Sequence, residues 1–168
     1  AALGLVLAIF YPLTKRFFAI PQLFLGLAFS WGIIMVSAAE LNQINHISLV
    51  LFVSCFFWIL AYDTAYAMSD KEDDIKVGLK SSALTFGNKV VHFFISFHLI
   101  ALGVWSWLGY QLNLHPLFFL SSLSWTFLII YQYKLIRDYD RHRCFLAFKN
   151  NNWVGFSLFV GSLLGTNL

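Results

Sequence analysis

Three aspartates, Asp63, Asp70 and Asp74, are spaced so that their carboxylates could act together in binding a metal. An α-helix turns by about 100° per residue, so helical structure here would place Asp70 and Asp74 within about 20° of Asp63 on one face. Carboxylates stacked in this way repel one another. A divalent metal relieves that repulsion most simply, and Mg²⁺ binds proteins through one or two carboxylates while substrate phosphates supply further ligands. The spacing therefore favours a metal site on one helical face.

The surrounding segment, residues 62–81, holds five of the eight acidic residues and reads YDTAYAMSDKEDDIKVGLKS. Tyr66 falls at the edge of the aspartate stripe and is expected to line a cavity. Lys76 and Lys80 follow, and lysines neutralise phosphate oxygens as point charges. The alternative for Asp63 is a structural cap or an ion pair with a neighbouring helix. For the D-x-x-x-D of the other two aspartates, the alternative is an ordinary acidic loop.

The composition indicates a membrane protein. Apolar residues make up 60% of the chain and charged residues 11%, with a mean hydropathy of +0.73, whereas soluble domains carry roughly 25% charge. Several apolar runs approach or exceed the ~20 residues that cross a bilayer as a helix. Isolated strands cannot satisfy their backbone in lipid, so we expect an all-α integral membrane bundle. The expected helical runs are residues 1–13, 22–39, 47–68, 90–110, 116–133 and 153–164, with a charged loop at 69–89 and a polar, basic segment at 134–152.

The basic residues alternate between connections. All eleven fall in the first, third and fifth connections, and none falls in the second or fourth: Lys15, Arg16; Lys71, Lys76, Lys80, Lys89; Lys134, Arg137, Arg141, Arg143, Lys149. The positive-inside rule predicts this alternation for six crossings, the first of them partial, with the odd loops on the cytoplasmic or matrix side. The net charge of +3 is too small and too localised to favour nucleic acid. Asp63 then lies just inside the apolar zone, where a carboxylate costs a few kcal/mol unless it faces a cavity or a partner.

Lys15 and Arg16 share this side of the membrane and are expected near the same anion, although plain topogenic charge explains them equally well. The five histidines show no metal-pair spacing. The sequence G-x-x-x-G over residues 161–165 is typical of a close helix contact.

Residues 62–81 closely resemble the second aspartate-rich motif of the UbiA superfamily of membrane prenyltransferases. Within that superfamily, the sequence of this segment most resembles that of the 4-hydroxybenzoate polyprenyltransferases of ubiquinone synthesis. Residues 11–16, which read YPLTKR, residues 21–32 and residues 144–155 agree with the same family. The resemblance runs along essentially the whole chain.

The resemblance implies a helical bundle around a central cavity, with residues 1–168 as one transmembrane domain. It implies Mg²⁺-dependent transfer of a polyprenyl group from polyprenyl diphosphate to the ring carbon ortho to the hydroxyl of 4-hydroxybenzoate. The lipid bilayer is the third expected partner. The expected location is a bacterial inner membrane, or alternatively a mitochondrial one.

By the family pattern, Asp70 and Asp74 bind Mg²⁺ bridged to the diphosphate, and Asp63 sits on the cavity side near the acceptor or the metal. These three are the expected catalytic residues. The residues expected to contact the diphosphate are Tyr11, Lys15, Arg16, Lys76 and Lys80.

One departure from the family matters. Its members carry a first aspartate-rich motif, N-D-x-x-D-x-x-x-D, which is not present in these 168 residues. We therefore expect the chain to be the C-terminal portion of a larger bundle, and to be inactive alone. Other readings stay open: a UbiA-type enzyme for naphthoate or homogentisate, a transporter with Asp63 as its coupling carboxylate, or an inactive remnant.

Overall fold

A computed structural model describes residues 2–166. In this part of the chain the structure is helical and holds no strand, which confirms the all-α prediction. Six long helices are joined by short connections, two of which contain short helices. The elements are α1 (Ala2–Thr14), α2 (Gln22–Leu41), α3 (His46–Val77), α4 (Ser82–Phe86), η1 (Gly87–Lys89), α5 (Val90–Gln111), η2 (Pro116–Phe118), α6 (Phe119–Ile136) and α7 (Arg141–Thr166).

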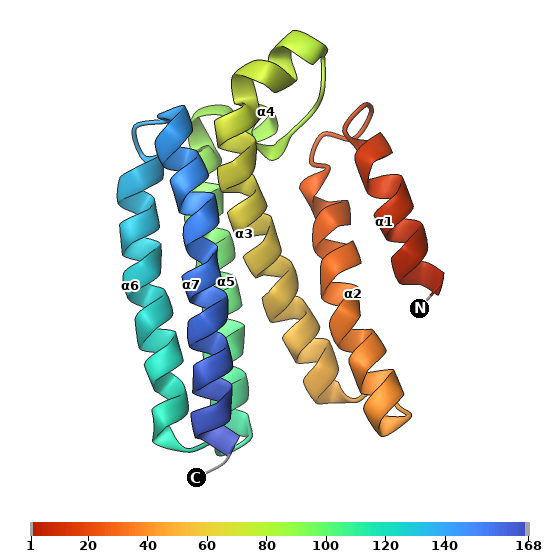
Figure 1. Ribbon diagram of the computed structural model, residues 1–168, viewed down its shortest axis with the longest axis vertical. Helices are drawn as coiled ribbons and strands as arrows, with labels where there is room; N and C mark the ends of the chain where they lie inside the picture. Colours follow the sequence, from red (N-terminus) through yellow and green to blue (C-terminus); the bar gives the residue numbers. More distant parts are fainter. Residues whose placement is uncertain (1, 167–168) are drawn as a thin grey trace.

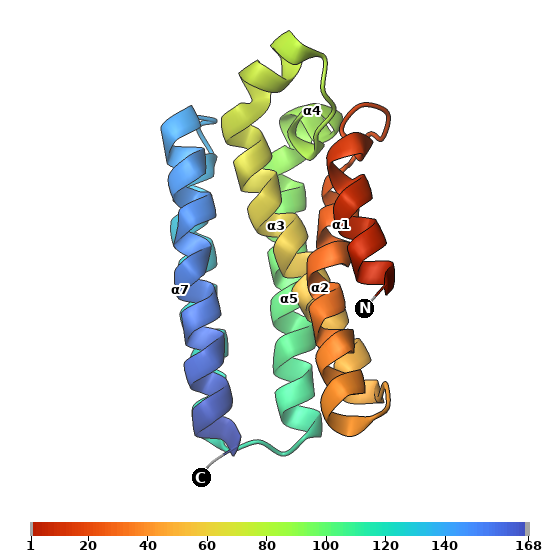
Figure 2. The same ribbon diagram turned by 45° about the vertical axis from the view of Figure 1, so that its right-hand side comes forward.

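Helix α3 lies at the centre of the arrangement. It packs against α2, α5 and α7, while α6 packs against α7 and α5, and α1 packs against α2. The long helices run side by side, with α1 and α2 on one flank and α6 and α7 on the other (Figures 1 and 2). Since α3 contacts both flanks, a side chain on α3 can meet partners from either one.

Helix α3 is also the longest element, with 32 residues. At 1.5 Å per residue it spans about 48 Å, which exceeds the ~30 Å hydrocarbon thickness of a bilayer. Its C-terminal turns accordingly extend beyond the ends of the neighbouring long helices (Figure 1). Asn45 caps its first turn by accepting a hydrogen bond from the Ser48 N–H at 2.8 Å. Gly78, with φ of +73°, ends it in the left-handed conformation that glycine adopts without strain.

The expectation of a charged loop over residues 69–89 was wrong for most of its length, since α3 includes residues 69–77 and residues 82–89 form α4 and η1. The helix continues to Val77, because no proline or glycine interrupts residues 69–77 and the acidic and basic side chains there sit at the exposed end. Lys76 even supports the last turns through an i,i+3 ion pair with Asp73 at 3.4 Å. The aspartate stripe therefore lies on one continuous helix.

The expectation for the last helix was also wrong in its start. Residues 134–152 are mostly helical, since α6 continues to Ile136 and α7 begins at Arg141. The Asp140 carboxylate accepts the Arg143 N–H at 2.8 Å and so supplies an N-cap. The polar residues of the first turns of α7 lie largely on its outer face, while a stripe at helical spacing is buried: Cys144, Ala147, Asn151, Val154, Gly161 and Gly165.

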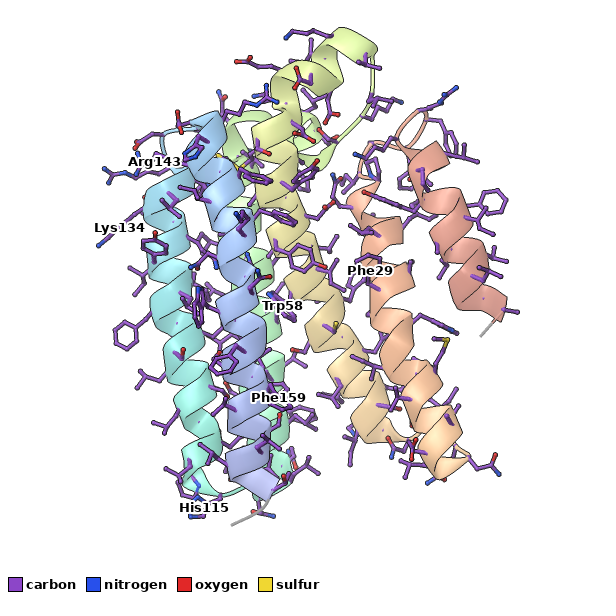
Figure 3. The ribbon with its side chains drawn as sticks, viewed as in Figure 1. Phe29, Trp58, His115, Lys134, Arg143 and Phe159 are labelled. Carbon is purple, nitrogen blue, oxygen red and sulfur yellow. The ribbon has the colours of Figure 1, made fainter. Side chains whose placement is uncertain are left out.

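The chain is an integral membrane protein. Within residues 2–166, three helical segments are long and apolar enough to cross a membrane, namely Gln22–Leu41, His46–Val77 and Ser82–Gln111, and Ala2–Thr14 is apolar but shorter. Large apolar side chains cover the outer surface, as Phe29 and Phe159 illustrate with 61% of each exposed (Figure 3). Extended apolar exposure of this kind suits contact with lipid.

The three basic connections meet at one end of the bundle. The Lys80 N–H donates to the Lys15 carbonyl at 2.8 Å, which joins the first connection to the third. Arg141 pairs with Asp73 at 2.6 Å, which joins the start of α7 to the last turns of α3 at the same end. Lys134 and Arg143 lie at this end, and His115 lies at the opposite one (Figure 3).

The G-x-x-x-G segment makes the close contact that its spacing predicts. A Cβ added at Gly161 would come within 2.5 Å of the Ser121 Cβ, and one added at Gly165 within 2.9 Å of the Phe118 Cβ. The two glycines thus let α7 approach η2 and the start of α6.

Candidate active site

The acidic stripe, defined as Asp63, Asp70 and Asp74, lies on the face of α3 that turns toward α1 and α2. Asp63 and Asp74 are each only 6% exposed, and Asp70 is half-buried. Mutual repulsion acts among all three carboxylates. Burial of repelling charges is unfavourable without a cation, so the stripe requires a positive partner.

Helix α1 supplies part of that partner. Electrostatic attraction links Lys15 to both Asp63 and Asp74. Tyr11, one turn earlier, lies close to Asp63, Asp74 and Tyr66. One ammonium cannot neutralise three carboxylates, so the stripe and Lys15 together still carry negative charge.

Gln22 is a residue of this site that sequence reasoning missed. It is 2% exposed, its amide oxygen accepts the Ser82 N–H at 3.0 Å, and its side chain lies next to Asp63. Ser82 also donates to the Thr64 hydroxyl at 3.1 Å, which ties this connection to α3. The available signal was a polar residue in the first turn of an otherwise apolar helix, directly after Pro21.

Ser81 is a second residue that sequence reasoning missed. It is fully buried and lies beside Asp74. Its Oγ is one of two buried side-chain polar atoms in residues 2–166 that make no hydrogen bond of normal geometry, the other being His98 Nε2, and it interacts favourably with the Asp74 carboxylate. A buried hydroxyl without a well-formed hydrogen bond is unfavourable, so its position next to a carboxylate marks a place for a polar ligand.

An aromatic wall adjoins the stripe on the α7 side. The ring of Tyr66 lies 5.1 Å from that of Phe148 and 6.4 Å from that of Phe145, between ring centroids. Tyr62 lies 5.9 Å from Phe148 and 5.8 Å from Trp58. The wall therefore places π-faces within one or two helical turns of the carboxylates.

A pocket of about 530 Å³ opens beside Asp70 at the polar end of this wall. Its lining combines α3 and the start of α7, with Tyr66, Ser69, Arg141 and His142 among its residues. Arg141 is held there by its ion pair with Asp73. Polar and aromatic groups thus surround one side of Asp70.

The remaining predicted residues lie apart from the stripe. Lys76 is exposed and pairs with Asp73. The Lys80 ammonium donates to the Phe17 carbonyl at 3.0 Å, and so holds the first and third connections together. Arg16 is exposed, next to Lys15 in the first connection. The structure thus brings Tyr11, Lys15 and Tyr66 to the aspartates, and the roles of Lys76, Lys80 and Arg16 remain predictions.

A second polar region, which we call the neutral cluster, lies deeper between α3, α5, α6 and α7. Trp58 donates to Asn151 Oδ1 at 2.9 Å, Gln132 donates to Asn150 Oδ1 at 3.0 Å, and Trp125 donates to His98 Nδ1 at 3.1 Å. Figure 3 shows Trp58 between α3 and α7. The members of this cluster are Trp58, His98, Trp125, Gln132, Asn150 and Asn151.

The acidic stripe has the oxygen donors that a magnesium ion prefers. In residues 2–166 no group of three or more His, Cys, Asp or Glu side chains lies close enough to hold a metal alone. Two carboxylates with substrate oxygens are the usual Mg²⁺ arrangement, and the Ser81 hydroxyl adds one more oxygen nearby. The residues present therefore fit a metal that is shared with a phosphate ligand.

The chain has relatives among known proteins. The UbiA prenyltransferase family model matches residues 1–161. The chain is 45% identical over 161 residues to a 4-hydroxybenzoate octaprenyltransferase of Nitrosospira multiformis, and 44% identical over 161 residues to one of Azoarcus sp.. Each alignment covers 96% of this chain and 56% of the relative. The chain therefore spans about half the length of these curated relatives.

The fold has a solved counterpart in the apo structure of a UbiA homolog from Aeropyrum pernix K1. The TM-score is 0.78 at 21% sequence identity, over 97% of this chain and 62% of that one. At this identity the likeness concerns the fold alone. With the family match over nearly the whole sequence, we conclude that the chain belongs to the UbiA prenyltransferase family.

Proposed function

We propose that this chain forms part of an enzyme that transfers a polyprenyl group from polyprenyl diphosphate to the ring carbon ortho to the hydroxyl of 4-hydroxybenzoate. The names of the related octaprenyltransferases support this acceptor. The observation that carries the proposal is the buried acidic stripe facing Lys15 at the polar end of a membrane bundle. A row of carboxylates with one lysine suits a metal-bound diphosphate and has no evident structural purpose.

In this proposal Asp70 and Asp74 hold the metal, which when bound supplies positive charge to the leaving diphosphate. Lys15, which faces Asp63 and Asp74, would add a fixed positive charge to the binding of the same diphosphate. Tyr11 and Ser81 offer hydroxyl donors close to Asp74. These groups are held before substrate arrives, so little reorganisation accompanies the reaction.

The reaction breaks the allylic C–O bond, and its electron pair leaves with the diphosphate. The ring carbon then donates a π-electron pair to the allylic carbon, and transfer of the ring proton to the released diphosphate restores aromaticity. An electron-deficient allylic group is attracted to aromatic π-faces, and Tyr62, Tyr66 and Phe148 supply them beside the stripe. The wall also keeps water from the cation.

Asp63 has a separate role in this proposal. It lies about two turns deeper along α3 than Asp70 and contacts Gln22 from α2. We place it on the acceptor side of the cavity, where with Gln22 it orients the substrate or the metal cluster. The Lys/Arg-rich end of the bundle faces the cytoplasm of a bacterial inner membrane in this proposal, as the positive-inside rule predicts.

The test is Mg²⁺-dependent transfer from a polyprenyl diphosphate by the protein expressed from its complete gene. We expect 4-hydroxybenzoate to be prenylated and chelation of Mg²⁺ to abolish product. Equimolar competition with 1,4-dihydroxy-2-naphthoate and homogentisate identifies the acceptor. Preference for either competitor would overturn the acceptor, and absence of prenyl transfer to all three would overturn the activity.

A second measurement concerns the 168 residues alone. We expect no transfer from the isolated chain, because only one aspartate-rich motif is present in it. Turnover by the isolated chain would show that a single motif suffices.

A further inference from the structure

A groove between α5 and α6 lies outside the proposed active site. Its volume is about 720 Å³, within the ~300–1,000 Å³ typical of small-molecule sites. Its length is lined by apolar side chains from both helices, and Leu99 and Ile130 on its rims are 54% and 48% exposed. In a membrane-spanning bundle, such a groove opens toward the hydrocarbon of the bilayer.

One end of the groove is polar. Asn88, His92, Tyr139 and Arg137 line it there. The Tyr139 hydroxyl donates to the Asn88 carbonyl at 3.1 Å and thereby connects the α6–α7 turn to η1. Tyr139 also has φ of +59°, a conformation that is uncommon for a bulky residue and recurs at ligand-binding segments.

The charge at this end is positive and only partly neutralised. Arg137 pairs with its neighbour Asp138 at 3.5 Å, and both side chains are more than half exposed, so the pair is weak. The other oxygen of Asp138 already accepts Arg143 at 2.8 Å. Lys134 lies at the same end (Figure 3) and forms no ion pair within the described residues.

We propose that this groove binds an anionic glycerophospholipid, with its phosphate against Arg137 and His92 and an acyl chain between α5 and α6. Charge complementarity selects the headgroup, since basic pockets between transmembrane helices bind anionic lipids. Arginine suits phosphate because its guanidinium donates two parallel hydrogen bonds. The apolar walls suit a hydrocarbon chain, and the small side chains of Ser96 and Thr126 leave room for one.

This site is independent of the proposed prenyl transfer. None of its lining residues belongs to the acidic stripe or to the aromatic wall. A test of lipid binding can therefore fail while prenyl transfer is observed, and the reverse.

The experiment uses the protein from its complete gene, purified and exposed to equimolar phosphatidylglycerol and phosphatidylcholine with identical acyl chains. Native mass spectrometry counts the lipids that stay bound. We expect a preference for phosphatidylglycerol that Arg137→Gln lowers about fivefold, the effect of one cation near an anionic lipid surface. Lys134→Gln is the matched control, because it removes a cation at the same end that does not line the groove.

Ser96→Trp tests the acyl-chain part. It fills the groove from an exposed position on α5 and leaves Arg137 intact. We expect it to reduce retention of both lipids, with unchanged helicity by circular dichroism confirming the fold. The proposal is overturned by equal retention of the two lipids, by equal losses in Arg137→Gln and Lys134→Gln, or by full retention in a folded Ser96→Trp protein.

Discussion

The acidic stripe and the neutral cluster both place polar side chains in the interior of a membrane bundle, but they do so in different ways. In the neutral cluster, amide and indole groups from three helices donate to neutral acceptors on neighbouring helices, as in the Trp58 to Asn151 and Gln132 to Asn150 bonds, and the His98 imidazole on a fourth helix accepts from Trp125. In the acidic stripe, three carboxylates from a single helix repel one another, and one lysine faces two of them.

This difference separates architecture from function. Hydrogen bonds between neutral groups on different helices stabilise the bundle without any ligand. Like charges on one helix destabilise it until a cation arrives. Each region leaves one buried polar atom without a hydrogen bond of normal geometry among residues 2–166, Ser81 Oγ beside the stripe and His98 Nε2 in the cluster, so such an atom alone does not distinguish them. The charge does.

The largest expected effect is loss of the carboxylates that hold the metal. Asp70→Asn and Asp74→Asn should each lower kcat/KM by at least about 10³-fold, or about 4 kcal/mol of transition-state stabilisation. Glu72→Gln is the control, since it removes an exposed carboxylate from the same helix outside the stripe. Steady-state prenyl transfer by membrane-inserted protein is the measurement. Near-normal turnover in both variants would show that Asp70 and Asp74 do not hold the metal.

Removal of the lysine that faces the stripe comes next. Lys15→Gln should raise KM for the prenyl diphosphate and lower kcat/KM about 10- to 100-fold, because a charge-assisted interaction contributes about 1.5–3 kcal/mol. Lys89→Gln removes an exposed ammonium in η1, which belongs neither to the stripe nor to the predicted diphosphate contacts, and we expect activity close to wild type. Similar losses in the two variants would mean that net charge at this end, and not the position of Lys15, governs binding.

The neutral cluster should respond in stability and not in catalysis. Asn151→Ala removes the acceptor for Trp58 and a donor to Gln132, and should lower the free energy of unfolding by about 1–2 kcal/mol. The adjacent Asn152→Ala, which is exposed, should leave it unchanged. Equilibrium unfolding in mixed micelles measures both. An unchanged unfolding free energy, with a 10³-fold fall in kcat/KM, would make the cluster part of the active site.

Ser81→Ala should have the smallest effect, and it should separate an effect on stability from an effect on substrate binding. The Ser81 hydroxyl is buried without a hydrogen bond of normal geometry but interacts favourably with the Asp74 carboxylate, so its removal should change the free energy of unfolding by about 1 kcal/mol or less. If the hydroxyl serves the diphosphate, affinity for that substrate should fall a few-fold in the same variant. Thermal unfolding with and without an unreactive prenyl diphosphate analogue reports both quantities. A larger loss of stability without ligand would instead give Ser81 a structural role.

Several features of this chain followed from its sequence. The membrane class, the all-α fold, the order of the long helices and the close contact of α7 at Gly161 were predicted correctly, because each depends on local composition or on spacing along one helix. The helical alignment of the acidic stripe followed for the same reason. The helix boundaries near charged residues could not be predicted from the sequence. A polar segment can be a loop, or it can be the part of a helix that extends beyond the membrane, and polarity alone does not distinguish the two.

Only the tertiary structure decided which side chains meet the stripe. Gln22 and Ser81 reach it from other segments, and their types are ordinary in the sequence. Lys15 and Lys80 are both lysines at the membrane edge, yet one faces Asp63 and the other binds the Phe17 carbonyl. The spacing of residues along one helix determines which side chains lie on the same face of that helix. Contacts between helices depend instead on how the helices pack and on the connections that bring distant parts of the chain together.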